Sequence, residues 1–316
     1  MPDDPRGRRA ARGRPRCRPG IAVVPARAGS GAATRSPGRD VGTGIAGGRV
    51  LDEAWTDIPD REPAAAGLPG DLHLTHTIDV PGHGTLPGEI DLRDAFPACL
   101  AGVPLHGRRV LDVAALSGFT SFALEALGAE VVSYDRVGGR HWDLVPFCDG
   151  VPAAPLTALL DTHQARIARA YRFCHAALGS RAERVEGDLY DIPAALGPVD
   201  AAVIGSLPQL RDPFRALHGA LRLVQETAVV TGLLPRRPLL ARLAEGAGDA
   251  PLVFLPRPGR GNPFEAWWRI PPRTVRHWLH VIGFGETRVA YRASRQAGRT
   301  LYAVVGRRTR ANRTAI

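Results

Sequence analysis

Residues 108–118 read RRVLDVAALSG, and residues 130–136 read EVVSYDR. The first stretch begins as a continuous apolar run, which is typical of a parallel strand covered on both faces. It ends in a short turn with Gly118, and the second stretch reads as the next strand of the same sheet. Ligands of open α/β sheets bind at the carboxyl ends of such strands. The turn at 112–118 is therefore the candidate binding site.

Strands and helices alternate along the chain from residue 108 onward. We expect strands at 108–113, 130–135, 184–188, 199–205 and 226–234, helices at 118–128, 164–178, 211–221 and 273–284, and a final antiparallel pair at 286–292 and 300–308. Alternating β and α units produce a mostly parallel sheet. The sequence thus predicts an α/β fold, with a Rossmann-like seven-stranded, mostly parallel sheet, a C-terminal antiparallel hairpin and helices on both faces.

The basic residues are unevenly distributed. All 41 are arginine, and the net charge is +10 over 316 residues, but residues 1–40 alone carry +7, which leaves +3 for the rest. We expect a disordered arginine-rich leader at 1–40, an N-terminal cap segment at 41–107, a core at 108–306 and a basic tail at 307–316. The leader's composition also admits an RNA-binding arm. The modest charge of the rest makes a nucleic-acid surface less favoured.

The spacing of the cysteines indicates whether the chain has disulfides or a metal site, and the length of its apolar runs indicates whether it spans a membrane. Cys17, Cys99, Cys148 and Cys174 are scattered without a C-x-x-C pair, so we expect reduced thiols, no disulfide framework and no metal site. No apolar run reaches membrane-spanning length, and no export signal is recognisable. We therefore expect a cytoplasmic, bacterial protein without a membrane partner.

The acidic residue after the second strand narrows the cofactor class. Asp135 lies 23 residues beyond Asp112, where a carboxylate can accept hydrogen bonds from both hydroxyls of a ribose. NAD and S-adenosylmethionine (SAM) both carry such a ribose. A dinucleotide site needs glycines for close approach to the pyrophosphate, yet Ala114 and Leu116 stand in this turn. The pattern favours SAM over NAD, and a plain structural turn with a chance acid is the alternative.

The stretch VLDVAALSGFTSFALEALGAEVVSYD at 110–135 resembles motif I and the following acidic strand of class I SAM-dependent methyltransferases. The chain is most similar to the tRNA wobble-uridine (carboxymethoxyuridine) methyltransferase-like group, in which D-x-G-x-x-x-G-F-x-x-F is typical. Further resembling segments are HTIDVPGHGTLPGEIDLR at 76–93, WDLVPF, CHAALGS, LYDIP, LRDPFRAL and NPFEAWWRIPP. The resemblance covers about residues 70–306 and implies a SAM-binding Rossmann-like fold.

The resemblance also implies the cofactor site, position by position. Asp112 and the turn at 114–118 would hold the methionine part of SAM, Asp135 the ribose, Asp188 and Leu189 the adenine, and Ile204 with Gly205 would lie under the sulfonium. The cofactor-binding candidates are Asp112, Ala114, Ser117, Gly118, Asp135, Arg136, Asp188, Leu189, Ile204 and Gly205.

Two positions depart from the family pattern. Ala114 replaces a usual glycine, so one backbone approach to SAM is expected to be looser. Pro208 and Gln209 stand where the tRNA-modifying group shows a Tyr-His pair, and glutamine cannot act as a general base. We therefore expect a retained cofactor site and a changed substrate.

His76 is the preferred candidate for a general base, ahead of His141 and His163, because the segment at 76–93 could fold over the site. A surface or satisfied histidine is the commoner alternative. The substrate-binding candidates are Arg93, Trp142, Gln209 and Trp268. Their alternatives are a surface ion pair for Arg93 and packing for the tryptophans.

The sequence predicts an enzyme that transfers a methyl group from SAM to a small-molecule acceptor, such as a secondary metabolite. A tRNA-modifying methyltransferase, a SAM-binding protein without catalysis and a nicotinamide-dependent oxidoreductase are the alternatives. The sequence leaves the acceptor and the oligomeric state open.

Overall fold

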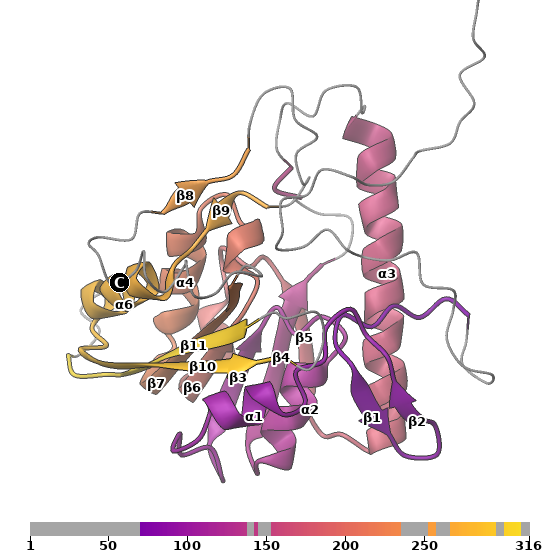
Figure 1. The fold of residues 1–316 in the computed structure, drawn as a ribbon, viewed down its shortest axis with the longest axis horizontal. Helices are drawn as coiled ribbons and strands as arrows, with labels where there is room; N and C mark the ends of the chain where they lie inside the picture. Colours follow the sequence, from indigo (N-terminus) through magenta and orange to yellow (C-terminus); the bar gives the residue numbers. More distant parts are fainter. Residues whose placement is uncertain are drawn as a thin grey trace, which may run out of the picture. The chain divides into compact units, whose positions relative to one another are not determined.

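A seven-stranded sheet forms the centre of the structure (Figure 1). The computed structural model describes residues 70–137, 142–144, 153–234, 252–256, 266–294 and 300–310, without side chains for 153–156. The chain divides into two units, Met1–Ala46 and Gly47–Ile316, and every described residue lies in the second. The expected leader, the start of the cap, His141 and the end of the basic tail lie outside the described residues.

The sheet order explains where the ligand edge lies. The strands are β3 (Arg109–Val113), β4 (Glu130–Arg136), β5 (Glu183–Gly187), β6 (Val199–Ile204), β7 (Val224–Leu234), β10 (Glu286–Ala293) and β11 (Thr300–Arg307). They lie in the order β10-β11-β7-β6-β3-β4-β5, and β11 is antiparallel to both of its neighbours. The predicted Rossmann-like sheet with its antiparallel pair is confirmed. Because β3 is flanked by β4 and β6, the chain reverses direction across the sheet there, which is the switch point of such folds.

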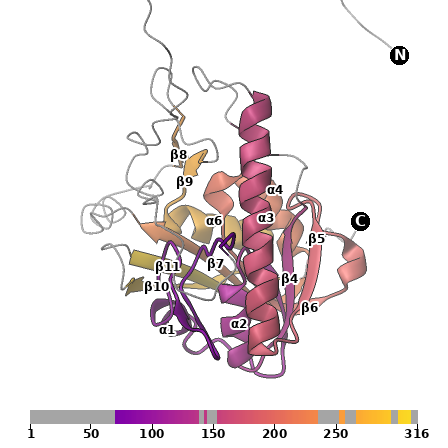
Figure 2. The same cartoon turned by 90° about the vertical axis from the view of Figure 1, so that its right-hand side faces the viewer.

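Helices cover both faces of the sheet (Figures 1 and 2). Helices α1 (Ala95–Cys99), α2 (Phe119–Ala126) and α3 (Ala153–Leu178) pack with Val110 and Val131 on one face. Helices α4 (Pro213–Leu221) and α6 (Pro272–Ile282) pack with Leu111 and Val132 on the other. Successive strand residues thus enter opposite apolar clusters, as the period of two in a strand requires. Two short 3₁₀ turns follow β5 and β6, at Ala194–Leu196 and Leu207–Gln209.

The cap segment packs on the same face as α1, α2 and α3. It contains an antiparallel hairpin of β1 (Ile78–Val80) and β2 (Gly84–Leu86), whose Ile78 and Leu86 join the apolar cluster of that face. The sequence analysis named no strands here, because each has only three residues. A second short antiparallel pair, β8 (Val253–Phe254) with β9 (Trp268–Arg269), was also not predicted.

Helix α3 begins at Ala153, whereas the sequence predicted a start at 164. The described side chains at 157–163 are half-buried or exposed, and Leu159 is 59% exposed. This part of the helix therefore has no apolar face for a periodic pattern to reveal. None of the helices in the described ranges has the length and apolarity that crossing a membrane requires.

Candidate functional site

The turn between β3 and α2 has an unusual backbone. Ala114 has φ 64°, Leu116 has φ 52° and Gly118 has φ 94°, so three residues of one short turn are left-handed. A left-handed conformation costs a residue with a Cβ about 1–2 kcal/mol. The turn therefore keeps the conformation that glycines would favour, although alanine and leucine occupy two of the three positions. Gly118 has no substitute, since a Cβ there would lie 2.4 Å from the ring of Phe122.

Strand β4 holds this turn in place. The amide of Ala114 donates to the carbonyl of Tyr134 at 2.8 Å, and the amide of Leu116 donates to Oδ2 of Asp135 at 3.0 Å. The amide of Gly118 closes the turn by donating to the carbonyl of Ala115 at 2.8 Å. These hydrogen bonds compensate for the strained backbone and place the turn directly beside the carboxylate of Asp135.

A third strained position lies at the end of the next strand. Ser206 has φ 56° and follows β6, and the amide of the preceding Gly205 reaches the carbonyl of Val113 at 3.4 Å. Within the described part of the chain, Ala114, Leu116 and Ser206 are the non-glycine residues with positive φ. All three follow neighbouring parallel strands, at the carboxyl edge where ligands of such sheets bind. Strain of this kind clusters at functional sites, which marks this edge as the candidate site.

The carboxylate of Asp135 lies at the centre of this edge. Its Oδ1 accepts from the amide of Arg136 at 2.8 Å and its Oδ2 from Leu116, and the residue is only 2% exposed. Burial raises the pKa of this carboxyl, and the charge of Arg184 opposes that effect. A carboxylate offers about four acceptor positions. Two acceptor positions therefore remain for the donors of a ligand.

Arg184 provides a second sign that this edge suits a polar ligand. Its Nη2 lies 3.7 Å from Asp135, and its guanidinium stacks 4.3 Å from the centre of the Tyr171 ring. Both terminal nitrogens are buried without a hydrogen-bond acceptor in the described structure. Buried donors are rarely left unpaired in native proteins. The residues present therefore fit a ligand that brings hydroxyl groups to Asp135 and acceptor atoms to Arg184. Sequence reasoning missed Arg184, because its position in β5 reads as an ordinary edge-strand arginine.

Asp112 points away from the edge into the layer between β3 and α2. Its Oδ2 accepts from Ser121 Oγ at 2.6 Å, Ser121 accepts from Ser133 Oγ at 2.7 Å, and Ser133 accepts from the Tyr171 hydroxyl at 2.8 Å. Burial is the main cause that raises the pKa of Asp112 to about 7. The chain of hydroxyls joins β3, α2, β4 and α3. From the sequence, Asp112 was expected to anchor either the turn or the amino group of SAM, and this chain of hydroxyls supports the first role.

The segment after β5 lies beside the same edge. The Tyr134 hydroxyl donates to the carbonyl of Asp188 at 3.1 Å, and the carboxylate of Asp188 accepts from the amide of Tyr190 at 2.8 Å. Leu189 is buried in the second apolar cluster. Gly187 must lack a side chain, because a Cβ would lie 2.0 Å from the Tyr134 hydroxyl. The adenine-facing roles of Asp188 and Leu189 stay predictions.

Ser117 connects the turn to the cap. Its Oγ lies 3.1 Å from the donating amide of Thr75 and 2.8 Å from the Thr75 hydroxyl. Ser117 is fully buried, so its side chain is engaged by the cap. His76, which follows Thr75 in the cap, stacks on Phe119 with ring centroids 5.4 Å apart. Its Nδ1 lies 3.1 Å from the Thr75 hydroxyl. The cap thus brings His76 beside the first turn of α2. Desolvation lowers the pKa of His76 to about 4.

Arg93 is engaged within the cap. It pairs with Asp79 at 2.6 Å and with Asp91 at 2.7 Å, and Asp79 also accepts from the Thr85 hydroxyl at 2.5 Å. With two carboxylates already bound, Arg93 corresponds to the surface ion pair that the sequence analysis kept as its alternative. We do not assign it to a ligand.

The aromatic candidates lie around Asp143, which sequence reasoning missed. The carboxylate of Asp143 accepts from the Tyr190 hydroxyl and from the amide of Arg211, and its carbonyl accepts from Trp267 Nε1 at 2.6 Å. Trp268 Nε1 donates to the carbonyl of Arg211 at 3.0 Å. These contacts gather the loops after β4, β5 and β6 with the segment before α6.

Two further candidates flank this cluster. Trp142 donates from Nε1 to Asp161 of α3 at 2.8 Å, and Arg136 stacks over its ring at 4.4 Å. Gln209 has a buried side-chain oxygen without a hydrogen-bond donor in the described structure. That oxygen is an available acceptor near the carboxyl end of β6.

Comparisons with known proteins give only distant likenesses. No protein-family model matches the sequence, and no curated protein is similar to it in sequence. The N-terminal domain of EvdMO1, solved with S-adenosylhomocysteine (SAH) and D-fucose, is 19% identical to this chain, with a TM-score of 0.46. The match covers 75% of this chain and 91% of that one. The 1,6-didemethyltoxoflavin-N1-methyltransferase of Burkholderia thailandensis, solved with bound 1,6-didemethyltoxoflavin and S-adenosylhomocysteine, is 15% identical. That match has a TM-score of 0.44 and covers 69% of this chain and 78% of the other.

The strained turn predicts opposite effects at two adjacent alanines. Ala114→Gly should raise the free energy of unfolding by up to about 1 kcal/mol. Glycine removes the steric cost of the left-handed conformation, and that gain is larger than the conformational entropy that glycine adds to the unfolded chain. Ala115→Gly is the matched control, since Ala115 is 3% exposed and outside the positive-φ set. It should lower the free energy of unfolding by about 1 kcal/mol. Urea denaturation measures both values, and changes of the same sign would contradict the assigned backbone.

The raised pKa of Asp112, about 7, predicts a pH-dependent stability. Between about pH 4 and pH 7 the folded state holds a proton that the unfolded carboxyl has released, so the free energy of unfolding falls as the pH rises. Asp112→Asn removes this proton uptake. The variant should match the native chain near pH 4 and exceed its stability by about 4 kcal/mol above pH 7.

Thermal unfolding of both proteins across this range measures the difference. Asp191→Asn, at a side chain that is 77% exposed, controls for the general loss of one negative charge. A constant difference between Asp112→Asn and the native chain at all pH values would contradict the assignment.

Proposed function

We propose that this chain is a SAM-dependent methyltransferase that acts on a small-molecule acceptor. The observation that carries the proposal is the strained turn at 114–118, held against the buried carboxylate of Asp135 at the carboxyl edge of the sheet. A turn of this conformation without a run of glycines suits a cofactor that has a ribose and no pyrophosphate. This reasoning supports SAM over a nicotinamide dinucleotide.

The chain's own residues divide the binding of the cofactor among themselves. Asp135 would accept from the ribose hydroxyls, and Arg184 would donate to an acceptor of the nucleoside. The segment Asp188–Leu189 would flank the adenine. Gly205 leaves space at the end of β6, since a Cβ there would meet only the Thr231 hydroxyl at 3.7 Å. Bound SAM supplies a sulfonium methyl group, which an acceptor nucleophile takes in an in-line displacement.

In such a reaction the protein mainly positions the acceptor and, where the nucleophile is protonated, removes its proton. His76 would serve as the proton acceptor through Nε2, in the tautomer whose Nδ1–H donates to the Thr75 hydroxyl. Gln209 would accept a hydrogen bond from the acceptor molecule through its buried oxygen. The tryptophans around Asp143 would form the wall of the acceptor pocket.

A small acceptor fits the charge of the chain better than tRNA does. Residues 41–316 carry only +3, and several arginines near the edge are already engaged by the protein. Arg211 stacks on Trp267, and Arg215 stacks on Tyr190. The Tyr-His pair of the tRNA-modifying group, which the sequence resembles, is replaced by Pro208 and Gln209. We expect the protein to meet its acceptor in the bacterial cytoplasm.

The first test of the function is SAM binding at Asp135. Asp135→Asn keeps the shape of the side chain but weakens its charge-assisted hydrogen bonds, so the affinity for SAM should fall about tenfold or more. Glu130→Gln changes an exposed carboxylate at the opposite end of the same strand and should leave the affinity unchanged. Isothermal titration with SAM and its demethylated product measures both variants. Tighter binding of NAD than of SAM by the native chain would refute the proposed cofactor.

The second test concerns the acceptor class. Residues 41–316 without the arginine-rich leader should bind bulk tRNA weakly at about 150 mM salt, because binding to a polyanion depends on phosphate neutralisation. The full chain serves as the comparison, since its leader adds +7. Filter binding at several salt concentrations measures both proteins. Micromolar, salt-sensitive binding by residues 41–316 would favour a tRNA-modifying enzyme instead.

A further inference from the structure

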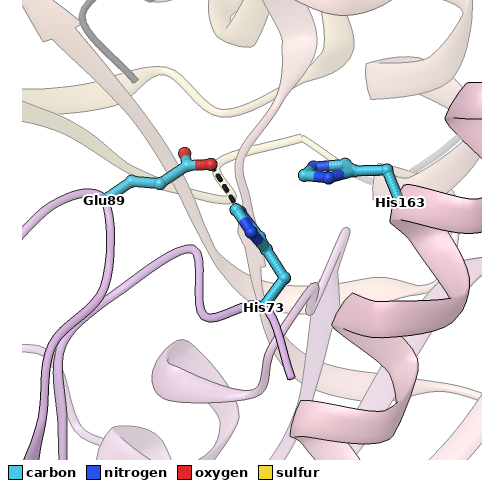
Figure 3. Close-up of side chains that lie close together, drawn as sticks. All are labelled: His73, Glu89 and His163. Carbon is cyan, nitrogen blue, oxygen red and sulfur yellow. Dashed lines mark hydrogen bonds and ion pairs between the residues drawn. The ribbon is translucent and has the colours of Figure 1, made fainter. Parts of the chain in front are cut away.

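Three side chains from separate segments meet where the cap lies against α3. His73 precedes β1, Glu89 follows β2, and His163 projects from α3 toward the other two (Figure 3). Their ligand atoms all lie within 4.8 Å of one another, and all three residues are half-buried. His73 Nε2 lies 2.6 Å from Glu89 Oε1, and the rings of His73 and His163 have centroids 4.3 Å apart at 59°.

We propose that His73, Glu89 and His163 bind one divalent transition-metal ion of the zinc class. Two imidazole nitrogens and one carboxylate oxygen form a set that zinc and its neighbours accept, whereas magnesium and calcium prefer oxygen ligands alone. In zinc enzymes, three protein ligands of this kind leave one coordination position for water or an oxygen of a bound molecule. The cysteine spacing predicted no metal site, and these three ligands, which include no cysteine, are far apart in the chain.

The backbone fixes the two cap ligands before any ion binds. The amide of Glu89 donates to the carbonyl of Leu74 at 3.1 Å, and the amide of Thr77 donates to the carbonyl of Ile90 at 2.9 Å. Gly88 permits this close pairing, since a Cβ there would lie 2.2 Å from the backbone of His76. The segments that carry His73 and Glu89 therefore lie side by side in a fixed register.

The third ligand is fixed by the helix. The amide of His73 reaches the carbonyl of Arg166 in α3 at 3.4 Å, which places the cap segment against the turn that follows His163. His163 forms no hydrogen bond with the described residues, and its ring contact is with His73. A histidine in a half-buried position with free ring nitrogens is available as a ligand. An ion here would join the cap to α3.

The proposed ion would also lie close to the candidate cofactor site. His73 is two residues before Thr75, whose amide and hydroxyl bind Ser117 of the strained turn. The metal proposal does not rest on the proposed methyl transfer, because it concerns different side chains and a ligand that can be measured alone. Loss of metal binding and loss of SAM binding are separate results.

Zinc titration of the full chain, after treatment with a chelator, tests the proposal. We expect one tightly bound equivalent and a higher thermal midpoint when zinc is present. His163→Gln and Glu89→Gln should each weaken zinc binding by more than about 100-fold, since even residues behind the ligands contribute 10- to 100-fold. His277→Gln, at an exposed histidine of α6 on the opposite face of the sheet, is the matched control and should bind zinc like the native chain.

Cobalt serves as a spectroscopic probe of the same site. The native chain should give the visible absorption of a low-coordinate Co²⁺ with nitrogen and oxygen ligands, and both ligand variants should lose it. Circular dichroism without metal shows whether each variant is folded. Because the two variants lie on different elements, the proposal can still be tested if one of them fails to fold. Zinc binding of equal strength in the native chain and both folded variants would overturn the proposal, as would the absence of binding by the native chain.

Discussion

The hydrogen bonds from the turn at 114–118 to strand β4 are the interactions on which the candidate site depends. Tyr134 accepts through its carbonyl and Asp135 through its carboxylate, so the same strand end shapes the turn and presents the buried acid. The left-handed residues cannot relax without losing these bonds. The turn, the acid and the start of α2 therefore form one rigid unit, and the cap is attached to that unit through Ser117.

The sequence predicted the parts of the structure that have strong periodic signals. The buried apolar runs of the central strands and the apolar faces of α2, α4 and α6 identified the sheet and most of its helices. The first half of α3 and the three-residue strands of the cap gave no such signal, since the former has no buried face and the latter are too short. The position of Asp135 was predicted from a local rule, namely that an acid after the second strand faces the ligand edge.

Residues that meet only through the tertiary fold could not be predicted in this way. Asp143 gathers loops after three strands, Arg184 on β5 lies beside Asp135 on the neighbouring β4, and His163 meets the cap from a helix. The identity of a residue also says little about its backbone. Ala114 and Leu116 stand where glycine is usual, yet both adopt the left-handed conformation that glycine would have. In this turn, the hydrogen-bond partners on β4 determine the conformation more than the residue types do.

The insertion of β11 between β7 and β10 has a consequence for the order in which the chain can fold. Thr300 pairs with Leu234, so the edge of β7 that faces β11 has no partner until the ribosome has released the whole stretch between these two residues. Pairings so distant in sequence form slowly, and an unpaired strand edge is a site of aggregation while it waits. A nascent chain that pauses after β7 should therefore need a chaperone more than the finished protein does.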